Sequence, residues 1–507
     1  MTVRVEHFCT VTDGYLDGNI GDAHVNICAV ARTVRAPPVR ACILTRMDLA
    51  SHVDDRSPRG IAATVARLVR GGDLRPGDRL PTVRTLAADL GVSPATVSGA
   101  WQALSAVGIV ISRGRAGTVV LPPPASWLPP RYRDLAGGAP ARLDLSTGTP
   151  DPELLPLIGP ALSRVALQRP AADTGAYVTS PVVPALEVLL RDSWPFAPQR
   201  ITVVDGALDA ISRTLERVAG YGSRVAVEDP GFPPLFDLLD QLGLVRVPVT
   251  LDRHGMRPDA LERALDAGAG VVVLQPRAHN PTGVSMTATR ARDLAAVLRR
   301  HDALVLEDDH SGEIASARDV SLGSLLPDRV VHVRSYSKSH GPDLRIAAVG
   351  GPASVLDGLV ARRMLGPGWT SRLLQHVLVD LLTDSSAIEA VAHARRVYYA
   401  RRRALRDALA THGVTIDPGD GINVWLPVHD ERTALVRLEA AGIRVAPGTP
   451  FSADGGTTSS GGSTDLMGED SGSLAGSTPR AHVRVTVGLL GAEVEDVARA
   501  LALAAAP

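Results

Sequence analysis

From about residue 200 onward, short apolar runs rich in β-branched residues alternate with segments of helical periodicity. The runs are ITVV (201–204), RVAV (224–227), VVVL (271–274), ALVL (303–306), VVHV (330–333) and RIAAV (345–349). This alternation predicts an α/β domain with a mostly parallel sheet that is buried on both faces. Ligands of such sheets gather at the carboxyl ends of the strands, so the residues that follow each run are the first candidates for chemistry.

Residues 57–121 show a different pattern, which predicts three helices followed by a two-stranded wing. Helices are expected around 59–70, from Thr82 to about Leu90, and from Ser93-Pro94 onward, where Ser is a good N-cap and Pro a good first residue. The third helix carries one apolar stripe at i, i+3, i+4 and i+7, made of Val97, Ala100, Trp101 and Leu104. The segment GIVISRGRAGTVVL then alternates apolar residues around a tip rich in Gly and Arg.

The charge of this module favours DNA as its partner. It contains eight arginines and three aspartates, a net charge of 8 − 3 = +5. The apolar stripe leaves small residues facing outward on the third helix: Ala95, Thr96, Ser98 and Gly99. A helix, a turn, a second helix and a basic wing are the parts with which winged helix-turn-helix proteins place a recognition helix in the major groove. The alternative is a small domain whose arginines are merely solvated and whose helices contact protein.

The pattern LPTVRTLAADLGVSPATVSGAWQAL, with GIVISRGRAGTVV after it, resembles the GntR family of bacterial transcription regulators over the whole module. The resemblance implies that Arg84, Arg113 and Arg115 hold DNA phosphates. It implies that Ser93, Thr96 and Ser98 approach the bases. The family has Tyr where Trp101 stands, which is a change in packing rather than in DNA contact.

Composition divides the remaining chain and bounds its class. Residues 1–56 are a poorly patterned extension, and the Pro- and Gly-rich stretch 122–140 predicts an extended linker to a large module at 141–507. Within that module, residues 452–478 are rich in Gly and Ser and predict a disordered insertion. The net charge of −1 excludes a globally basic coat protein. Without a signal peptide or membrane span in the sequence, we expect a soluble, cytoplasmic protein that binds no structural metal.

One residue count raises a chemical question. Of the 53 Lys and Arg residues, Lys338 is the only lysine. Arginine stays protonated, whereas a desolvated lysine amine can be a nucleophile, so Lys338 is a candidate Schiff-base residue. Chance survival of one lysine at the surface is the alternative that composition alone favours.

Polar residues follow the predicted strands in an order that suits a pyridine aldehyde phosphate. Such a group needs an amine, a carboxylate for the ring nitrogen, donors to the phenolate oxygen and a phosphate cradle. Lys338 supplies the amine and Asp308 the carboxylate, with Asp309 as the alternative one residue on. Phe232 either stacks on the ring or belongs to the core. The phosphate partners are Gly206 with the amides of Ala207 and Leu208 at a helix start, and Ser335, Ser337 and Arg345 around the lysine.

The motifs VVDGALDAI, VEDPGFPP, HNPTG, LEDD and SYSKSHGPDLR resemble the fold-type I enzymes of the class I/II aminotransferase family over nearly all of 141–507. The resemblance implies an α/β fold with a smaller C-terminal α/β subdomain, and pyridoxal 5'-phosphate as cofactor. It implies that Asn280 donates to the phenolate oxygen, Tyr177 reaches the phosphate in the partner subunit, and Arg484 binds a substrate carboxylate. Two departures concern the cofactor site: His310 stands near the position of the family's Tyr, and VTSPVVP replaces the Gly-rich stretch after Tyr177.

A GntR-like head joined to an aminotransferase-like domain resembles the MocR family of transcription regulators over residues 57–507. The resemblance implies a homodimer with exchanged DNA-binding heads that binds operator DNA and senses an amino compound or the cofactor. The alternative is a working aminotransferase with an accessory DNA-binding head, in which Lys338 also acts as the general base of transamination.

Overall fold

The computed structural model describes residues 49–106, 108–112, 117–122, 128–136, 141–168, 175–177, 179–453 and 481–507. The predictions for the first 48 residues, for Arg113 and Arg115 at the wing tip, and for a disordered insertion from 454 onward lie outside these residues. Among the described residues, no helix is long and apolar enough to cross a membrane.

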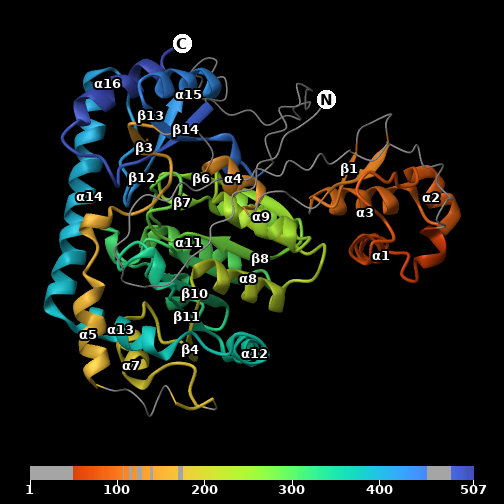
Figure 1. Ribbon diagram of the computed structural model, residues 1–507, viewed down its shortest axis with the longest axis horizontal. Coiled ribbons are helices and arrows are strands. Elements are labelled where there is room, and N and C mark those ends of the chain that lie inside the picture. The colour runs from red at the N-terminus through yellow and green to blue at the C-terminus, as the bar shows by residue number, and fades with distance from the viewer. Residues whose placement is uncertain are drawn as a thin grey trace, which may run out of the picture. The chain divides into compact units, whose positions relative to one another are not determined.

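The N-terminal domain contains the three predicted helices and the wing (Figure 1). These are α1 (Pro58–Gly71), α2 (Val83–Leu90), α3 (Pro94–Ala106), β1 (Val110–Ser112) and β2 (Thr118–Val120). The hydroxyls of Ser57 and Thr82 cap α1 and α2, because each accepts a hydrogen bond from an amide of the first turn. Strands β1 and β2 pair in antiparallel fashion, with Ile111 opposite Val119.

The predicted apolar stripe of α3 forms the centre of this small core. Val97 and Ala100 are fully buried, and Trp101 and Leu104 are at most 3% exposed. The core extends into residues that the sequence pattern assigned to the N-terminal extension. Leu49, in the 3-10 helix η1 (Leu49–His52), and Val53 are buried, and Arg67 donates to the carbonyl of His52 at 3.3 Å. Two apolar residues of the poorly patterned segment 1–56 therefore bury their side chains although the segment has no periodicity.

The predicted extended linker contains a helix, α4 (Pro130–Ala136). Proline supports the first turn of a helix, so a proline pair marks its start rather than excluding it. Arg131 fixes the helix to α9 (Pro233–Gln241): its backbone amide and guanidinium each bond Asp237 at 2.9 Å, and the guanidinium also bonds Asp240 at 2.8 Å. These partners lie about a hundred residues away, which is why local composition did not reveal the helix.

The large domain is built on an eight-stranded sheet in the order β4-β11-β10-β9-β8-β5-β6-β7. Its strands are β4 (Arg200–Val204), β5 (Arg224–Asp229), β6 (Val245–Asp252), β7 (Gly255–Met256), β8 (Ala269–Leu274), β9 (Leu304–Asp309), β10 (Val330–Ser335) and β11 (Ala347–Gly351). Only β11 and β7 run antiparallel to their neighbours, so the predicted α/β class with a mostly parallel sheet is confirmed.

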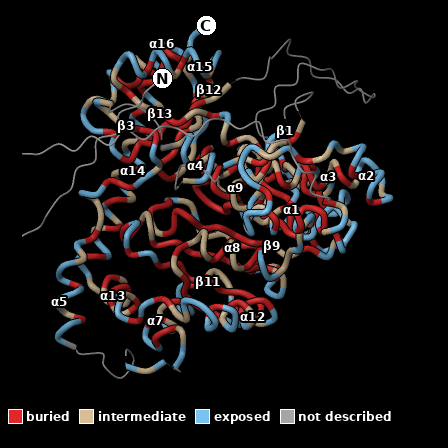
Figure 2. Tube along the Cα trace, turned by 45° about the vertical axis from the view of Figure 1, so that its right-hand side comes forward, coloured by how far each residue is buried: buried red, intermediate tan, exposed pale blue. Residues whose placement is uncertain are grey.

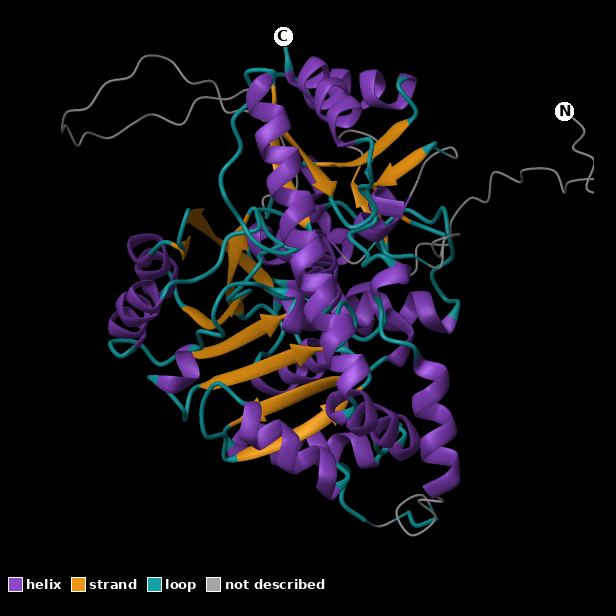
Figure 3. Cartoon of the chain, turned by 90° about the vertical axis from the view of Figure 1, so that its left-hand side faces the viewer, coloured by secondary structure: helices purple, strands orange, loops and turns teal. Residues whose placement is uncertain are grey.

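Helices cover both faces of this sheet, and its strands are buried (Figures 2 and 3). One apolar cluster joins the strands to α8 (Ala207–Val218), α9 and α12 (Ala353–Met364), and another joins them to α10 (Pro258–Asp266) and α11 (Ala288–Leu298). A third cluster contains residues of α5 (Ile158–Gln168), α7 (Pro184–Ser193) and α13 (Arg372–Thr383). Burial on both faces explains why the strands appear in the sequence as continuous apolar runs.

The smaller C-terminal subdomain is a four-stranded sheet in the order β12-β14-β13-β3. It consists of β12 (Asn423–Val428), β13 (Ile443–Pro447) and β14 (Ala481–Thr486), with β3 (Leu143–Leu145) paired parallel to β13. The long helix α14 (Ser385–Thr411), with α15 (Glu431–Ala440) and α16 (Val494–Ala505), packs on it around one apolar cluster. The expected α/β subdomain is therefore present, and it recruits a strand from the beginning of the large module.

Candidate cofactor site

Strand register brings the predicted site residues to one edge of the large sheet. Ala347 of β11 pairs with Val204 on one side and with Ser335 on the other, so β4 and β10 end at the same level. The registers of β10 with β9 and of β9 with β8 continue this edge toward Asp308 and Leu274. Residues that lie more than a hundred positions apart in the chain thus meet at the carboxyl ends of the strands.

The turn between β4 and α8 forms a candidate phosphate cradle. Gly206 is the N-cap of α8 with φ at +111°, and Ala207 and Leu208 begin the helix, where backbone amides have no partner within the helix. A Cβ on Gly206 would lie 2.6 Å from Nη2 of Arg345, so only glycine allows this approach. Arg345 itself donates to the carbonyl of Asp205 at 2.9 Å. The structure therefore brings Arg345 to the helix start that the sequence predicted as a phosphate site.

Arg363, which the sequence pattern did not single out, stabilises this turn by hydrogen bonds. Arg363, 2% exposed on α12, donates to the carboxylates of Asp205 and Asp209 at 3.2 and 2.8 Å. Thr370 donates to Asp205 at 2.7 Å. Nothing in the local sequence around Asp205 and Asp209 indicated that an arginine far along the chain neutralises their carboxylates.

Lys338 follows β10, and its surroundings as a whole disfavour its protonation. Burial lowers the pKa of its amine to about 8, and the nearby Arg484 guanidinium contributes in the same direction. The carboxylate of Asp308 opposes this shift. An amine with such a pKa is available in its neutral, nucleophilic form near physiological pH.

Asp308 and Asp309, neighbours on β9, have different surroundings. Asp309 forms a two-point ion pair with Arg277, at 2.8 and 2.7 Å. Asp308 is 4% exposed, and its Oδ1 has no hydrogen-bond partner among the described residues. Burial raises the pKa of Asp308 to about 6, since nothing comparable to Arg277 faces it. A buried carboxylate oxygen without a donor fits a protonated pyridine nitrogen, which would supply both a hydrogen bond and a positive charge.

Gln275, which the sequence analysis did not single out, bridges two of the predicted residues. Its Nε2 donates to Asp308 Oδ2 at 2.9 Å, and its Oε1 accepts from the backbone amide of Asn280 at 2.8 Å. Its own amide donates to Glu228 at 2.8 Å. Its position directly after the VVVL run was the one available signal, because that is where strand-end ligands occur.

A small cavity lies beside Asp308 and is lined by Glu228, Gly231, Phe232, Leu235, Val273, Leu274, Gln275 and Asp308. Phe232 is the N-cap residue of α9 and is partly buried, and it both lines this cavity and packs against the apolar cluster of α8, α9 and α12. Burial raises the pKa of Glu228 to about 8 and lowers that of His279 to about 3, and their side chains lie 3.3 Å apart. The lining of the cavity thus combines apolar side chains with the carboxyl groups of Glu228 and Asp308, whose pKa values are raised by burial.

Asn280 and Arg484, two further residues of the predicted site, contact each other. Arg484 of β14 is 2% exposed and donates to Asn280 Oδ1 at 3.4 Å and to the carbonyl of Ser146. Its guanidinium lies 5.2 Å from the ring centre of Phe451. Burial lowers the pKa of Arg484 to about 10, and its Nε has no partner among the described residues. A buried guanidinium with a free donor suits a ligand carboxylate.

The remaining predicted residues take different places. His310 is buried beside Lys338, its Nε2 bonds the carbonyl of Ala278 at 2.9 Å, and burial lowers its pKa to about 3. Ser335 ends β10, and its hydroxyl accepts from the amide of Ser337 at 3.3 Å.

Tyr177 is 83% exposed, with its ring edge-on to Trp369. Tyr177 is therefore accessible for a second chain.

The residues that the sequence predicts to contact DNA lie at the surface of the head. Arg84 on α2 is exposed, and Thr96 and Ser98 on α3 are partly exposed. The Ser93 hydroxyl accepts from the amide of Thr96 at 3.2 Å, so Ser93 caps the helix that would enter the groove.

Comparisons with known proteins agree with this architecture. A model of the aminotransferase class I and II family matches residues 142–469, and a model of the bacterial regulatory proteins of the gntR family matches residues 59–120. Among solved structures, LysN, an α-aminoadipate aminotransferase of Thermus thermophilus complexed with N-(5'-phosphopyridoxyl)-L-leucine, shares the fold. Its TM-score is 0.62 at 23% identity, over 74% of this chain and 94% of that one.

The class of protein follows from these matches: a GntR-type DNA-binding domain is joined to a fold-type I aminotransferase domain, a fold that implies pyridoxal phosphate as cofactor. The vitamin B6 salvage pathway transcriptional repressor PtsJ of Salmonella typhimurium is 37% identical over 408 residues, which are 79% of this chain and 92% of PtsJ. The HTH-type transcriptional regulator TauR of Rhodobacter capsulatus is 30% identical over 76% of this chain and 87% of TauR. This chain belongs to the MocR-type transcription regulators.

Proposed function

We propose that this regulator holds pyridoxal 5'-phosphate on Lys338 and that occupancy of this site controls DNA binding by its winged helix. The observation that carries the proposal is a buried carboxylate oxygen without a donor at the same sheet edge as the one lysine. Asp308 has a buried oxygen without a donor, and Lys338 has an amine whose pKa is lowered to about 8. The cofactor would give Asp308 a hydrogen-bond donor at its ring nitrogen, and its aldehyde carbon would accept the neutral amine of Lys338.

The other residues would orient the cofactor between these two points. The bound group supplies an electron-withdrawing ring and a reactive carbonyl carbon. The amides of Ala207 and Leu208, with Ser335, Ser337 and Arg345, would hold its phosphate. Phe232 would cover one ring face. Asn280 would donate to the phenolate oxygen, because Arg484 already binds the Oδ1 of Asn280 and leaves its amide hydrogens free to donate.

His310 would take a place different from that of the family's Tyr. Since its pKa is about 3, the imidazole stays neutral, and its Nε2 contacts the carbonyl of Ala278. It would therefore shape the pocket beside Lys338 and add no charge to it.

We infer that the protein acts as a homodimer, with Tyr177 completing the partner's phosphate site. The support is the 83% exposure of this ring, whose edge-on contact with Trp369 leaves most of its surface open. In the dimer, Arg84, Arg113 and Arg115 would hold phosphates of two half-sites, while Ser93, Thr96 and Ser98 approach the bases.

We propose the cofactor itself as the effector. The printed names of two relatives concern vitamin B6: the salvage repressor PtsJ and the pyridoxine biosynthesis regulator PdxR of Corynebacterium glutamicum, which is 27% identical over 71% of this chain. A ligand changes DNA binding only through a difference in its affinity for two states of the protein. Coupling between cofactor and operator is therefore the quantity to measure.

The test is a gel-shift assay on the protein's own upstream DNA, with the apo protein, with added pyridoxal phosphate, and with Lys338→Ala. We expect the cofactor to change the operator affinity of the native chain but not of Lys338→Ala. Absence of a shift under every cofactor condition would remove DNA regulation. An equal cofactor response in Lys338→Ala would remove the assigned role of this lysine.

A second function is favoured by one observation, the buried guanidinium of Arg484 with its free Nε. If a substrate carboxylate binds there, the neutral Lys338 amine can move a proton at the substrate's α-carbon, as transamination requires. Multiple turnovers with an amino donor and a keto-acid acceptor would establish this activity, and single-turnover spectra without further cycles would oppose it.

A further inference from the structure

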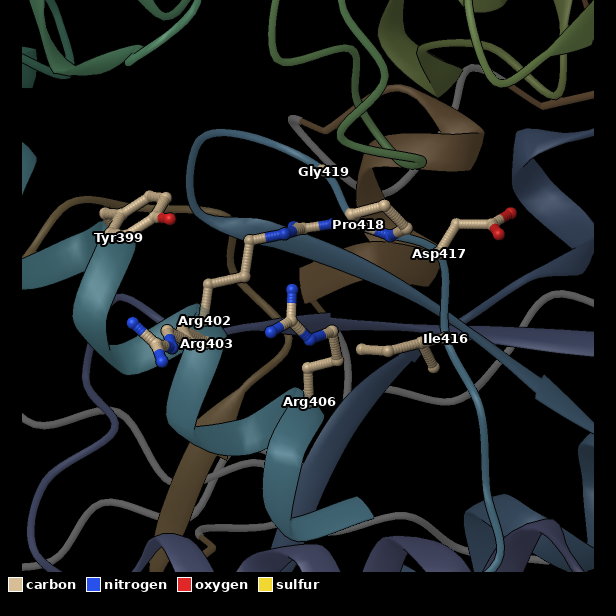
Figure 4. A pocket seen from close by; sticks show the side chains of 8 residues that line it. All are labelled: Tyr399, Arg402, Arg403, Arg406, Ile416, Asp417, Pro418 and Gly419. Atoms are coloured by element: carbon tan, nitrogen blue, oxygen red, sulfur yellow. The ribbon is translucent and has the colours of Figure 1, made fainter. Parts of the chain in front are cut away.

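A second cavity lies outside the cofactor site, between α14 and the loop that leads into β12. It is partly open to solvent and is lined by Tyr399, Arg402, Arg403, Arg406, Ile416, Asp417, Pro418 and Gly419 (Figure 4). Three of its eight residues are arginines from a single stretch of one helix. Such a density of cations around one cavity requires a physical reason.

Arg402 is the least exposed of the three and lacks a counter-charge. It is 6% exposed and donates to the carbonyl of Asn423, and no described carboxylate lies within ion-pair distance of it. Burial and the neighbouring Arg406 lower its pKa to about 10. Asp420 is the nearest acidic influence, but its carboxylate already accepts from the amides of Ser316 and Ala317. A buried cation without an anion is unfavourable.

The two outer arginines share a single carboxylate. Asp407 lies 2.8 Å from Arg406 and 3.5 Å from Arg403, and its side chain is 53% exposed. Asp417 lines the cavity, but Figure 4 shows its carboxylate pointing away from the guanidinium groups. Figure 4 also shows the side chains of Arg402 and Arg406 extending toward the same space in front of Pro418. The guanidinium groups of Arg402 and Arg406 thus face this space, Arg403 lies at its edge, and one exposed carboxylate only partly neutralises the three cations.

We propose that this cavity binds a phosphate group, either as inorganic phosphate or as part of a phosphate monoester. A dianion with several acceptor oxygens matches guanidinium donors in charge and geometry. The hydroxyl of Tyr399 adds a neutral donor at the rim. A bound phosphate gives the charge of Arg402 a counter-charge. It also replaces Asp407 as the partner of Arg403 and Arg406.

The position of the cavity connects it to the cofactor site. A Cβ on Gly283 would lie 2.6 Å from Nη2 of Arg402, so the guanidinium rests directly on this glycine. The amide of Asp420 donates to the carbonyl of Gly283 at 2.7 Å. Gly283 ends the segment that begins with Asn280. On the proposed function, phosphate at Arg402 therefore acts on the loop that carries a cofactor ligand.

The experiment uses the holo protein after borohydride reduction, which fixes the cofactor on Lys338 and fills the first phosphate site. Inorganic phosphate and pyridoxine phosphate are titrated in separate calorimetric arms, with chloride at matched ionic strength as reference. We expect saturable binding in at least one arm, and at least tenfold weaker binding in the double variant Arg403→Gln/Arg406→Gln. Arg396→Gln is the matched control, because Arg396 lies exposed on the same helix and pairs with Glu389.

Several outcomes overturn the inference: no saturable phosphate binding above the chloride reference, or equal affinity in the double variant. Equal loss in Arg396→Gln would assign the effect to general helix charge and would also overturn it. The proposed function fails separately, since a chain that does not hold the cofactor on Lys338 shows no fixed chromophore there after reduction. Binding in the pyridoxine phosphate arm alone identifies a monoester site, and binding in both arms identifies a phosphate site.

Discussion

Individual side chains in this protein often serve two neighbours, and Gln275 is the clearest example. It bonds the carboxylate of Asp308 and the backbone of Asn280, which would lie on different sides of the cofactor ring. Its amide group has one donor end and one acceptor end, and both are used. Glutamate could not donate to Asp308, and an apolar residue could bond neither partner.

Replacing Gln275 should therefore disturb both cofactor contacts together. We expect Gln275→Leu to weaken pyridoxal phosphate binding by roughly tenfold to a hundredfold, because a hydrogen bond to a charged group contributes about 1.5–3 kcal/mol. Equilibrium titration of the apo protein measures this. Gln199→Leu is the control, since Gln199 is exposed and bonds Asp328. Unchanged affinity in Gln275→Leu would contradict the bridging role.

The lowered pKa of Lys338 predicts the pH dependence of cofactor attachment. Only the neutral amine attacks the aldehyde, so the attachment rate should rise with pH and level off above about 8 instead of near 10.5. Stopped-flow absorbance at a series of pH values checks this. A rate that still rises above pH 9 would contradict it, and Lys338→Ala should show no visible band at any pH while keeping its far-UV circular dichroism.

At the scale of elements, the sequence pattern predicted structure well where a segment's own periodicity decides it. Helices α1 and α2 of the head begin and end within about one residue of their predicted bounds, and α3 begins where it was predicted, because Ser57, Thr82 and Gly91 provide local caps. Helix α4 was not predicted, because its anchoring carboxylates on α9 come from a distant segment. Strand β3 escaped notice for the same reason, since its pairing partner lies three hundred residues later.

Helix α4 should depend on Arg131 for its attachment. Asp237 is largely withdrawn from water, and burial raises its pKa, so Arg131→Gln removes the cation that neutralises it. We expect cleavage by trypsin after Arg133 to become about tenfold faster, the factor expected for a loss of roughly 1–2 kcal/mol. Arg257→Gln, which breaks an exposed pair with Asp259, is the control and should leave cleavage unchanged. Equal cleavage rates in all three proteins would show that α4 is held by other contacts.

At the scale of the whole molecule, arginine supplies the cations of both domains except one. Every cation of the DNA-binding head is an arginine, and the single lysine lies in the cofactor domain. Arginine suits phosphate contacts because its fork of donors is fixed, whereas only lysine can bond a carbonyl carbon covalently. A regulator built this way combines a salt-sensitive surface with one reactive amine.

Operator binding should show this salt sensitivity residue by residue. We expect Arg84→Gln to weaken binding to specific and unrelated DNA alike, and to reduce the slope of log affinity against log salt by about one. Fluorescence anisotropy between 50 and 200 mM salt, about the range where such slopes are measured, tests this. Arg292→Gln, on α11 of the large domain, is the control. A loss confined to the operator would assign Arg84 to base recognition instead.

The sequence by itself determined the two-domain organisation, the α/β class, and the residue types at the strand ends, because these follow from periodicity, capping and motif spacing along a continuous segment. Tertiary structure decided which carboxylate is free. Asp308 and Asp309 cannot be distinguished in the sequence. In the structure, Arg277 forms an ion pair with Asp309, and Asp308 keeps an oxygen without a hydrogen-bond donor among the described residues. It also decided that Gln275 bridges the site, that Arg363 supports the phosphate turn, and that Arg402 rests on Gly283. These contacts join segments far apart in the chain, and their geometry depends on strand register and helix packing, which no local pattern contains.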